Sequence, residues 1–521
     1  MTPRISRVRR PSAVPLALVL AVALVALMSL LPVLYILLRA REAGWEHSMT
    51  LVFRPRVYEL LVNTLQMDVA VTLLCAVIGT ITAWLIERTD LPGSKLWNAA
   101  VMLPFAVPSF IGSYSWVSIL PGIEGLKGVI LVMTLSNYPL VHLPVAAALR
   151  GMDPALEETS RSLGYSRKQT FFRVILPQLR PAILGGAILI ALHMLAEFGA
   201  LSFLNYETFT TAIFDQYNVV FDGASAAMLT LVLLSLCVMV IGLELLSRGR
   251  ARYATQRQGA PGELERIRLG AGKPLALAGV ACLVALAAGV PLGTITYWLL
   301  TGSSAAFDVA IVTRSLYTTL AFGMGGALLT VLLALPLVFL AVRYQGRLAT
   351  LAERLPYFIH SLPGLVIGLT LVFFAIRYAY PLYQTVPLLL IGYAMLYLPL
   401  AQSSIRSVLV QVPSQLEEVA GSLGKRSLSV FARVTLPLIA PGVGAGLALV
   451  FLQVMKELTA TLLLRPTGVD TLATRVWVHT ASGEYAASAP YAALLILVSG
   501  LPVYLLTMRS FTRSKQKRGE T

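Results

Sequence analysis

Two stretches of the chain decide its architecture: 156-LEETSRSLGYSRKQTFFRVILPQLRPAI-183 and 416-LEEVAGSLGKRSLSVFARVTLPLIAPGV-443. They align without a gap, and each residue of the first stretch lies 260 positions before its counterpart, as Glu158 does before Glu418. The register continues beyond them, where Glu197 matches Glu457. Self-similarity of this length is the signature of a duplicated structural unit. The chain is therefore expected to consist of two related halves.

The repeated stretch also predicts a local structure. Asp153-Pro154 and Val412-Pro413 suit a helix start, because proline is tolerated in the first turn. Acidic residues are expected in that first turn, where the helix dipole favours them, and these are Glu157, Glu158, Glu417 and Glu418. About two turns later come Gly164 and Gly424, a residue type that commonly ends helices. Each copy is thus predicted to form a short helix, a glycine turn and a second helix that ends at Leu-Pro.

The composition places the chain in a membrane. Of its 521 residues 57% are hydrophobic and 13% are charged, whereas soluble domains average about 25% charged residues. The net charge of +16 raises the alternative of nucleic-acid binding. The basic residues, however, lie in short stretches between apolar runs, as topology determinants do. We therefore expect a polytopic membrane protein that binds no nucleic acid.

A helix needs about 20 apolar residues to cross the hydrocarbon core, and twelve runs of that kind are present. They fall near 14–38, 60–86, 97–120, 128–149, 181–204, 224–246, 274–300, 315–342, 355–376, 385–404, 441–464 and 487–507. The first run is longer than the apolar region of a secretory signal, so it is expected to be a retained span. The third and ninth runs are rich in proline and glycine and are predicted to be bent or broken. Such bends could gate a pathway or simply adjust helix packing around proline.

The distribution of lysine and arginine predicts the orientation. Most of the basic residues fall in alternate loops that share a side with both termini, which places the two repeated stretches and both termini in the cytoplasm. One outer loop departs from the rule, because residues 39–59 contain Arg39, Arg41, Arg54 and Arg56. The polar segment around Gly259–Gly262 reads as a linker. The predicted organisation is a first six-helix repeat at 1–250, a linker at 251–273 and a second repeat at 274–521.

Six spans per half is an even number, so both halves insert with the same orientation. The expected fold is all-α, with twelve transmembrane helices in two parallel repeats related by an axis along the membrane normal. A pathway would then run along that axis.

The repeated stretch resembles the EAA loop of the permeases of ATP-binding-cassette (ABC) importers. The residues that carry the resemblance are Glu158-Thr159-Ser160 with Gly164 and Ile175-Leu176-Pro177, and Glu418-Val419-Ala420 with Gly424 and Thr435-Leu436-Pro437. The small residues depart in part from the family's Ala-Ala, and Thr435 replaces a hydrophobe. The resemblance implies the type I importer fold in the bacterial inner membrane. It also implies two copies of an ABC ATPase subunit inside, each bound by one loop, and a substrate-binding protein outside.

Within that family, the fusion of two halves in one chain is similar to the iron(III) and thiamine permeases, with relatives for phosphonates. The stretches 196-AEFGALSFLNYETFTTAIFDQY-217 and 461-TLLLRPTGVDTLATRVW-477 resemble the iron(III) group most. The expected substrate is therefore iron(III), with thiamine or a phosphonate as alternatives. An ion-coupled secondary transporter is the competing class, but it gives no reason for a duplicated cytoplasmic loop.

The residues expected to couple the permease to its ATPase are Glu157, Glu158, Gly164, Pro177, Glu417, Glu418, Gly424 and Pro437. The alternative is that they only cap ordinary loop helices. The candidates for the transport pathway are His193, Glu197, Gln453 and Glu457, with Lys456 nearby, because ionisable groups inside apolar helices are costly and often functional. Glu197 lies about 24 Å along its helix from Pro181, so it could instead simply reach water at the outer end.

Chemistry within this chain is not expected. It has no GxxxxGK[ST] phosphate-binding motif, so ATP and Mg²⁺ are expected on the partner ATPase. The three cysteines, Cys75, Cys237 and Cys282, are isolated in apolar runs and predict neither a metal cluster nor a disulfide. Tyr206, Tyr217 and Tyr485 are assigned no metal role, because interfacial tyrosines are common in membrane proteins. An intramembrane enzyme lacks any catalytic constellation here, and the chain is expected to be a transport subunit.

Overall fold

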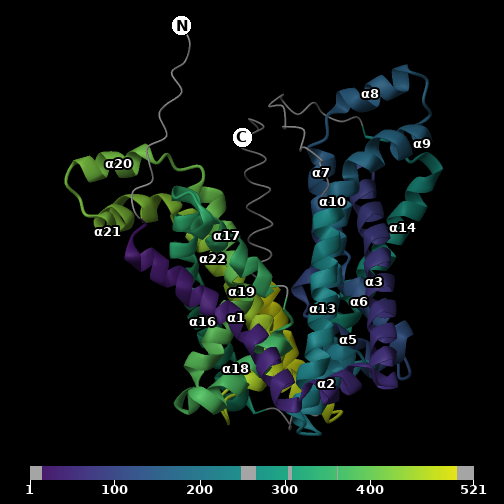
Figure 1. Ribbon diagram of the computed structural model, residues 1–521. Coiled ribbons are helices and arrows are strands. Elements are labelled where there is room, and N and C mark those ends of the chain that lie inside the picture. Colours follow the sequence, from purple (N-terminus) through teal and green to yellow (C-terminus); the bar gives the residue numbers. More distant parts are fainter. Residues whose placement is uncertain (1–13, 248–265, 303–307, 361, 501–521) are drawn as a thin grey trace. The chain divides into compact units, whose positions relative to one another are not determined.

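The computed structural model describes residues 14–247, 266–302, 308–360 and 362–500 (Figure 1). Throughout these ranges the regular structure is helical, and the β-contact is an isolated bridge between Thr89 and Ile267. The expected all-α class is confirmed for the described residues. The physical reason is the apolar sequence, because only a helix satisfies all the backbone N–H and C=O groups of a single segment in lipid.

Nine helical segments of the described chain are long and apolar enough to cross a membrane, or ten if one bent pair counts as a span. They are α1 (Leu16–Ala43), α3 (Pro55–Arg88), α6 with α7 (Gly125–Asn137 and Pro139–Arg150), α9 to α10 (Arg167–Thr170 and Leu176–Ala196), α13 (Gly223–Ser247), α14 with α15 (Lys273–Val284 and Val290–Thr301), α16 (Val309–Arg343), α19 (Val386–Leu409) and α21 to α22 (Ser427–Val430 and Leu436–Lys456). The predicted number of twelve is not confirmed.

Three of the predicted spans, the third, the ninth and the twelfth, are not continuous helices long enough to cross a membrane within the described residues. The third is the bent pair, in which the segments Ser94–Ala106 and Ser109–Ile119 meet at 89° next to Pro108, as predicted for a proline-rich run. The ninth run divides between α17 (Arg347–His360) and α18 (Gly364–Tyr378). The twelfth is an apolar helix at Tyr485–Gly500, and the rest of that predicted span, from residue 501, lies outside the described residues.

The described chain forms two compact units. The larger unit comprises Arg39–Thr313 and Leu472–Thr521, and the smaller unit comprises Met1–Leu38 and Arg314–Thr471. In the larger unit, α3, α6, α7 and α10 surround an apolar core to which they contribute Val71, Val132, Val141 and Ile190. In the smaller unit, α19 packs along α22.

Each unit therefore contains the first span of the other sequence repeat. In the smaller unit, Tyr35 of α1 packs its ring on Phe373 of α18, with the ring centroids 5.2 Å apart. In the larger unit, Trp298 of α15 donates a hydrogen bond from its indole to Ser118 Oγ of α5 (Ser109–Ile119) at 3.3 Å. The predicted boundaries at 250 and 273 describe repeats in the sequence and stay a prediction, and most of the predicted linker lies outside the described residues.

Small residues set how closely the long helices approach. A Cβ added to Gly79 of α3 would lie 2.9 Å from the carbonyl oxygen of Tyr138, and one added to Gly186 of α10 would lie 2.9 Å from that of Leu140. Side chains at these positions would collide with the backbone of the neighbouring segment, so glycine permits the contact.

We expect the Gly186→Ala variant to be less stable, by about 1–3 kcal/mol, because the methyl group forces α10 away from the backbone of α7. The matched control is Gly185→Ala, since an added Cβ there meets nothing within 4 Å. The measurement is the thermal unfolding temperature of the purified protein in detergent. Equal unfolding temperatures for the two variants would contradict the close contact.

Candidate functional site

The first repeat loop, residues 153–177, is a helix–glycine–helix element. Asp153 caps α8 (Pro154–Ser162) by accepting a hydrogen bond from the amide of Ala155. Gly164 has φ +86°, and the amides of Gly164 and Tyr165 donate to the carbonyls of Arg161 and Ser160. This pair of bonds is a Schellman motif, in which a left-handed glycine ends the helix. The short helix α9 follows.

The second repeat loop, residues 413–437, closes in the same way. Gly424 has φ +77° after α20 (Gln415–Ser422), and the amides of Gly424 and Lys425 donate to Gly421 and Ala420. The predicted short helix and glycine turn are thus confirmed in both copies. The second helix does not end at Leu-Pro as predicted, because it continues through Leu176-Pro177 and Leu436-Pro437 into a long helix.

The helix starts also differ in part from prediction. α8 begins at Pro154, as predicted, so Glu158 falls in its second turn, whereas α20 begins at Gln415, two residues after Pro413, and holds both Glu417 and Glu418 in its first turn.

Each loop rejoins its long helix through one turn of π-helix. The turns are η2 (Phe171–Ile175) and η7 (Phe431–Thr435), and they run directly into α10 and α22. Pro177 and Pro437 are the second residues of those helices and donate no backbone hydrogen bond. A π turn accommodates this gap in the bond ladder, and such turns occur frequently at functional sites. Figure 1 shows α8 and α9 at one end of the α3 and α10 bundle, and α20 and α21 at one end of α22.

The first glutamate of each loop turns inward to an arginine. Glu157 pairs with Arg88 at the last residue of α3, and Glu417 pairs with Arg343 at the last residue of α16, at 3.0 Å. The Arg88 side chain is only 2% exposed. Removal of one partner from such a buried pair typically costs about 3–5 kcal/mol. Burial and the negative charge of Glu417 also raise the pKa of Tyr344, which follows α16.

The second loop contains a compensated departure from the family pattern. The hydroxyl of Thr435, in place of a hydrophobe, donates to Glu417 Oε1 at 3.0 Å, so its polar atom is satisfied although the residue is fully buried. Its counterpart in the first loop, Ile175, is buried in the apolar core. A hydroxyl that supports the inward glutamate explains why threonine is tolerated here.

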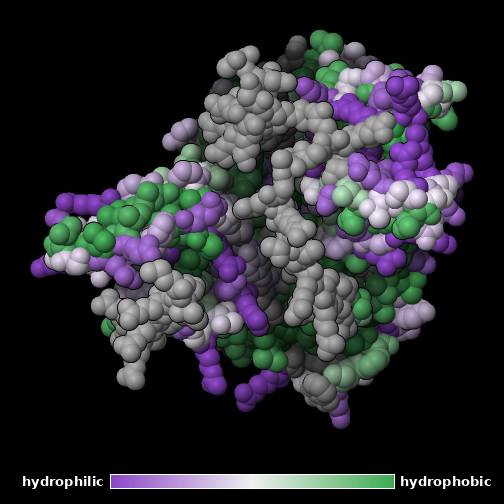
Figure 2. Space-filling model, turned by 90° about the horizontal axis from the view of Figure 1, so that it is seen from above, coloured by the Kyte–Doolittle hydropathy of each residue, from purple (hydrophilic) through white to green (hydrophobic). Residues whose placement is uncertain are grey.

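The second glutamate of each loop faces solvent, together with apolar side chains. Glu158 and Glu418 are exposed, and the neighbouring Leu163 and Leu423 are 72% and 75% exposed. In Figure 2 the lobe on the left, which α20 and α21 form, shows hydrophobic residues bordered by hydrophilic ones. An apolar patch with a charged rim is the composition of a protein-binding surface.

Sequence reasoning missed Arg88 and Arg343. Both residues end a long apolar run, and they lie 255 positions apart, the spacing that also relates Pro108 to Pro363. That shared spacing is the signal that could have identified them.

The predicted pathway acids lie at breaks in the helices. The spans predicted at 181–204 and 441–464 are interrupted at Glu197 and Glu457, which have extended backbones and separate α10 from α11 (Gly199–Phe203) and α22 from α23 (Thr459–Leu464). Each carboxylate accepts the amide three residues ahead, from Ala200 or Ala460, at 3.0 Å. The acids thus satisfy amides that the break exposes, a role that hydropathy does not reveal.

At each helix break, a side-chain hydroxyl also donates a hydrogen bond to the carboxylate. Ser109 donates to Glu197 Oε2 at 2.8 Å, and Tyr397 donates to Glu457 Oε2 at 2.6 Å. His193 Nε2 lies 3.6 Å from Glu197 Oε2, so this predicted pair is brought together. Gln453 occupies the matching position, four residues before Glu457, and is half-buried. The structure therefore brings His193 and Glu197 together and places Gln453 one helical turn before Glu457.

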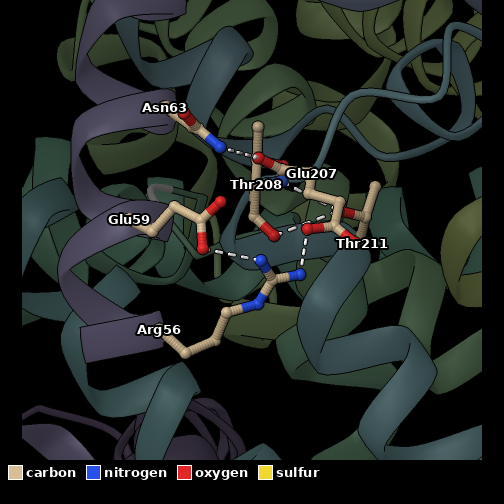
Figure 3. Close-up of polar contacts among 6 residues, drawn as sticks. All are labelled: Arg56, Glu59, Asn63, Glu207, Thr208 and Thr211. Atoms are coloured by element: carbon tan, nitrogen blue, oxygen red, sulfur yellow. Dashed lines mark hydrogen bonds and ion pairs between the residues drawn. The ribbon is translucent and has the colours of Figure 1, made fainter. Parts of the chain in front are cut away.

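A polar cluster ties the N-terminal end of α3 to the loop before α12 (Phe209–Asn218) (Figure 3). Arg56 pairs with Glu59 at 2.7 Å and with Glu207, and Asn63 donates to the carbonyl of Glu207 at 3.2 Å. Arg39 likewise pairs with Glu42 at 3.1 Å. Acids therefore balance two of the four arginines that depart from the predicted charge distribution.

The end of the predicted linker is anchored beside Arg88. The amide of Ile267 donates to the carbonyl of Arg88 at 2.8 Å, and the amide of Asp90 donates to the carbonyl of Ile267 at 3.1 Å. Lys273 pairs with Asp90 at 2.7 Å. The hydrogen bonds from Lys273 and from the amide of Leu269 lower the pKa of the Asp90 carboxyl. This segment fixes the start of the second repeat to the end of α3.

Two of the three tyrosines that were assigned no metal role, Tyr206 and Tyr485, have structural contacts. Tyr206 donates to the carbonyl of Asn63 at 3.1 Å, and Tyr485 stacks on Tyr114 with the centroids 6.0 Å apart. Across the described residues, no group of three or more His, Cys, Asp or Glu side chains is placed to hold a metal ion.

A family model described as binding-protein-dependent transport system inner membrane component matches the chain twice, at residues 76–252 and 338–518. Each match contains one repeat loop. The Fe(3+)-transport system permease protein FbpB 2 of Haemophilus influenzae is 45% identical over 506 residues, which are 96% of this chain and 99% of that protein. The sulfate transport system permease proteins CysT of Salmonella typhimurium and Escherichia coli are each 28% identical over 196 residues, or 34% of this chain and 70% of either protein.

We expect the Tyr397→Phe variant to unfold at a lower temperature, because it removes the 2.6 Å hydrogen bond to the Glu457 carboxylate. Hydrogen bonds to charged groups contribute about 1.5–3 kcal/mol. Thermal unfolding in detergent measures the change. Tyr378→Phe is the control, since Tyr378 is 62% exposed. A Tyr397→Phe protein as stable as this control would mean that the bond does not support the break.

Proposed function

The chain belongs to the family of binding-protein-dependent transport system inner membrane components, and on that basis we propose that it is the permease subunit of an ABC importer for iron(III). The observation that carries this proposal is the similarity to an Fe(3+)-transport permease over 96% of the chain, combined with two repeat loops of the same structure. The chain is an integral inner membrane protein and a transport subunit. Its partners are an ATPase and a substrate-binding protein.

The two repeat loops support a stoichiometry of two ATPase copies per permease chain. One chain carries both loops, each with an exposed glutamate and an exposed leucine beside a glycine turn. ABC ATPase subunits act in pairs, so each loop would bind one copy. Glu158 and Leu163, or Glu418 and Leu423, would contact the ATPase, while Gly164 and Gly424 set the shape of the loop.

The proposed transport cycle is alternating access. The binding protein delivers iron(III) at the outer face, and closure of the ATPase pair moves the two loops and switches the permease between outward-open and inward-open states. Both termini are proposed to be cytoplasmic, on the side that carries the repeat loops and most of the lysines and arginines. Two parallel repeats fit this cycle, because a pathway at the repeat interface opens alternately to either side.

Iron(III) is favoured over the other substrates by the extent of the similarity. The sulfate permeases cover about a third of this chain at 28% identity, which supports the machinery but not their substrate. Thiamine and phosphonates remain alternatives within the same machinery. The two repeat loops count against an ion-coupled secondary transporter, which needs no ATPase.

We expect cells that lack the chromosomal copy to recover iron(III) uptake when they produce this chain with its cognate ATPase and binding protein. The Gly424→Ala variant is expected to lower both uptake and the amount of ATPase that co-purifies by about fivefold to tenfold. The physical reason is that φ +77° costs an alanine about 1–2 kcal/mol in a loop that must keep its shape.

Gly421→Ala is the matched control, since Gly421 lies in the same loop without a left-handed backbone and an added Cβ there meets nothing within 4 Å. Uptake of labelled thiamine or phosphonate, without uptake of iron(III), would reject iron(III) as the substrate. ATPase binding that is unaffected by Gly424→Ala would count against loop docking.

Glu197 and Glu457 are proposed to lend negative charge to the outer part of the pathway, where it would attract a ferric ion. The double variant Glu197→Gln/Glu457→Gln is expected to lose at least tenfold in iron(III) uptake while it retains its ATPase. Glu124→Gln, which removes an exposed acid elsewhere, is the control. Undiminished uptake by the double variant would reject the pathway role and leave only the structural role at the helix breaks.

A further inference from the structure

Each repeat loop is attached to the end of a long helix by the same two contacts. One is the ion pair between the inward glutamate and the terminal arginine. The other joins an aromatic residue one turn earlier on the long helix to the aromatic residue that opens the π turn. Trp84 meets Phe171 edge-on at 4.7 Å between centroids, and Phe339 meets Phe431 edge-on at 5.7 Å.

We propose that Arg88 and Arg343 are positioning residues that transmit the movement of each repeat loop to the long helices α3 and α16. The proposal rests on the proposed function of the loops as ATPase docking sites. It separates the two adjacent glutamates of each loop: Glu157 and Glu417 hold the loop to the permease, and Glu158 and Glu418 face the ATPase.

The contacts of Arg343 show how the attachment works. Its Nε and Nη2 atoms both donate to Glu417 Oε1, at 3.2 and 3.0 Å, and Nη2 also donates to the carbonyl of Val412 at 3.0 Å. Thr435 of the π turn donates to the same carboxylate oxygen at 3.0 Å. One carboxylate therefore joins the end of α16, the start of α20 and the end of the π turn, so the three segments are held as one body.

In the first repeat the loop is also attached through an arginine–glutamate ion pair, but the groups around this pair are different. Arg88 pairs with Glu157, and its guanidinium lies over the ring of Trp84, 5.6 Å from the centroid. That ring is the one that contacts Phe171. The charge contact and the aromatic contact thus form one continuous cluster. Their recurrence at matching positions, in different chemical surroundings, indicates a common requirement rather than a local accident of packing.

The long helices are suited to carry the movement. α3 has 34 residues and α16 has 35, so each is about 50 Å long and exceeds the thickness of the hydrocarbon core. A displacement applied to the arginine end of an unbroken helix moves the whole helix as a rigid body. Glu157 and Glu417 are poorly placed to bind a partner, since their side chains are only 20% and 16% exposed.

The test uses the full complex of permease and ATPase in lipid vesicles, with the binding protein loaded with iron(III). We expect Arg343→Met and Glu417→Gln to retain the co-purified ATPase and to hydrolyse ATP within about twofold of the unaltered complex, while iron(III) uptake per ATP falls about tenfold. The exchanged pair Arg343→Glu/Glu417→Arg is expected to transport several times better than either of its single changes. A purely structural role would not change the ratio of transport to hydrolysis.

Arg347→Met is the matched control, because Arg347 is an exposed arginine four residues later, at the start of α17. Normal uptake per ATP by both single variants overturns the proposal, as does loss of the ATPase from Glu417→Gln, which would make Glu417 a docking contact. If Arg343→Met does not fold, Arg343→Lys is used in its place, because it keeps the charge but loses the forked contact. An unchanged iron(III) uptake per ATP in this variant overturns the proposal. Retention of the ATPase by Glu418→Arg would instead reject the docking function itself.

Discussion

The need to satisfy every backbone polar group inside lipid governs this structure. It makes the described chain helical, and it explains what happens wherever a helix stops within an apolar run. At the two helix breaks, carboxylates accept amides that would otherwise be exposed, and Glu197 and Glu457 do so with the same geometry in both repeats. Residues that look like isolated charges in a hydropathy profile are therefore parts of the backbone's own hydrogen bonding.

The repeat loops meet the same requirement at the ends of the long helices. A left-handed glycine closes each first helix with two backbone bonds, and a π turn leads into the next long helix ahead of a proline. The loops are then fixed to the permease through Glu157 and Glu417, which leaves Glu158 and Glu418 outside. A rigid loop with an exposed apolar and acidic tip is suited to convert the movement of an ATPase into the movement of helices.

The two repeat loops have the same backbone geometry, but polar side chains in one loop stand where apolar side chains stand in the other. Ser160 and Thr170 share a hydrogen bond of 3.0 Å in the first loop, where the second loop has Ala420 and Val430. Conversely, Thr435 stands in the second loop where the first has Ile175. Polar and apolar pairs of similar size fill the same positions, because the fold requires a satisfied contact there and not one particular residue type.

The sequence alone determined the all-helical membrane class, the repeat at a spacing of 260 residues and the turn at Gly164 and Gly424, since these depend on composition, local spacing and backbone conformation. Only the tertiary structure decided that each compact unit takes the first span of the other repeat, because no local pattern records which helix packs on which. It also decided the different surroundings of the adjacent glutamates, one paired with an arginine and the other exposed. Both are acids near a helix start, and only the position of Arg88 or Arg343, about 70 residues earlier in the chain, turns one of them inward.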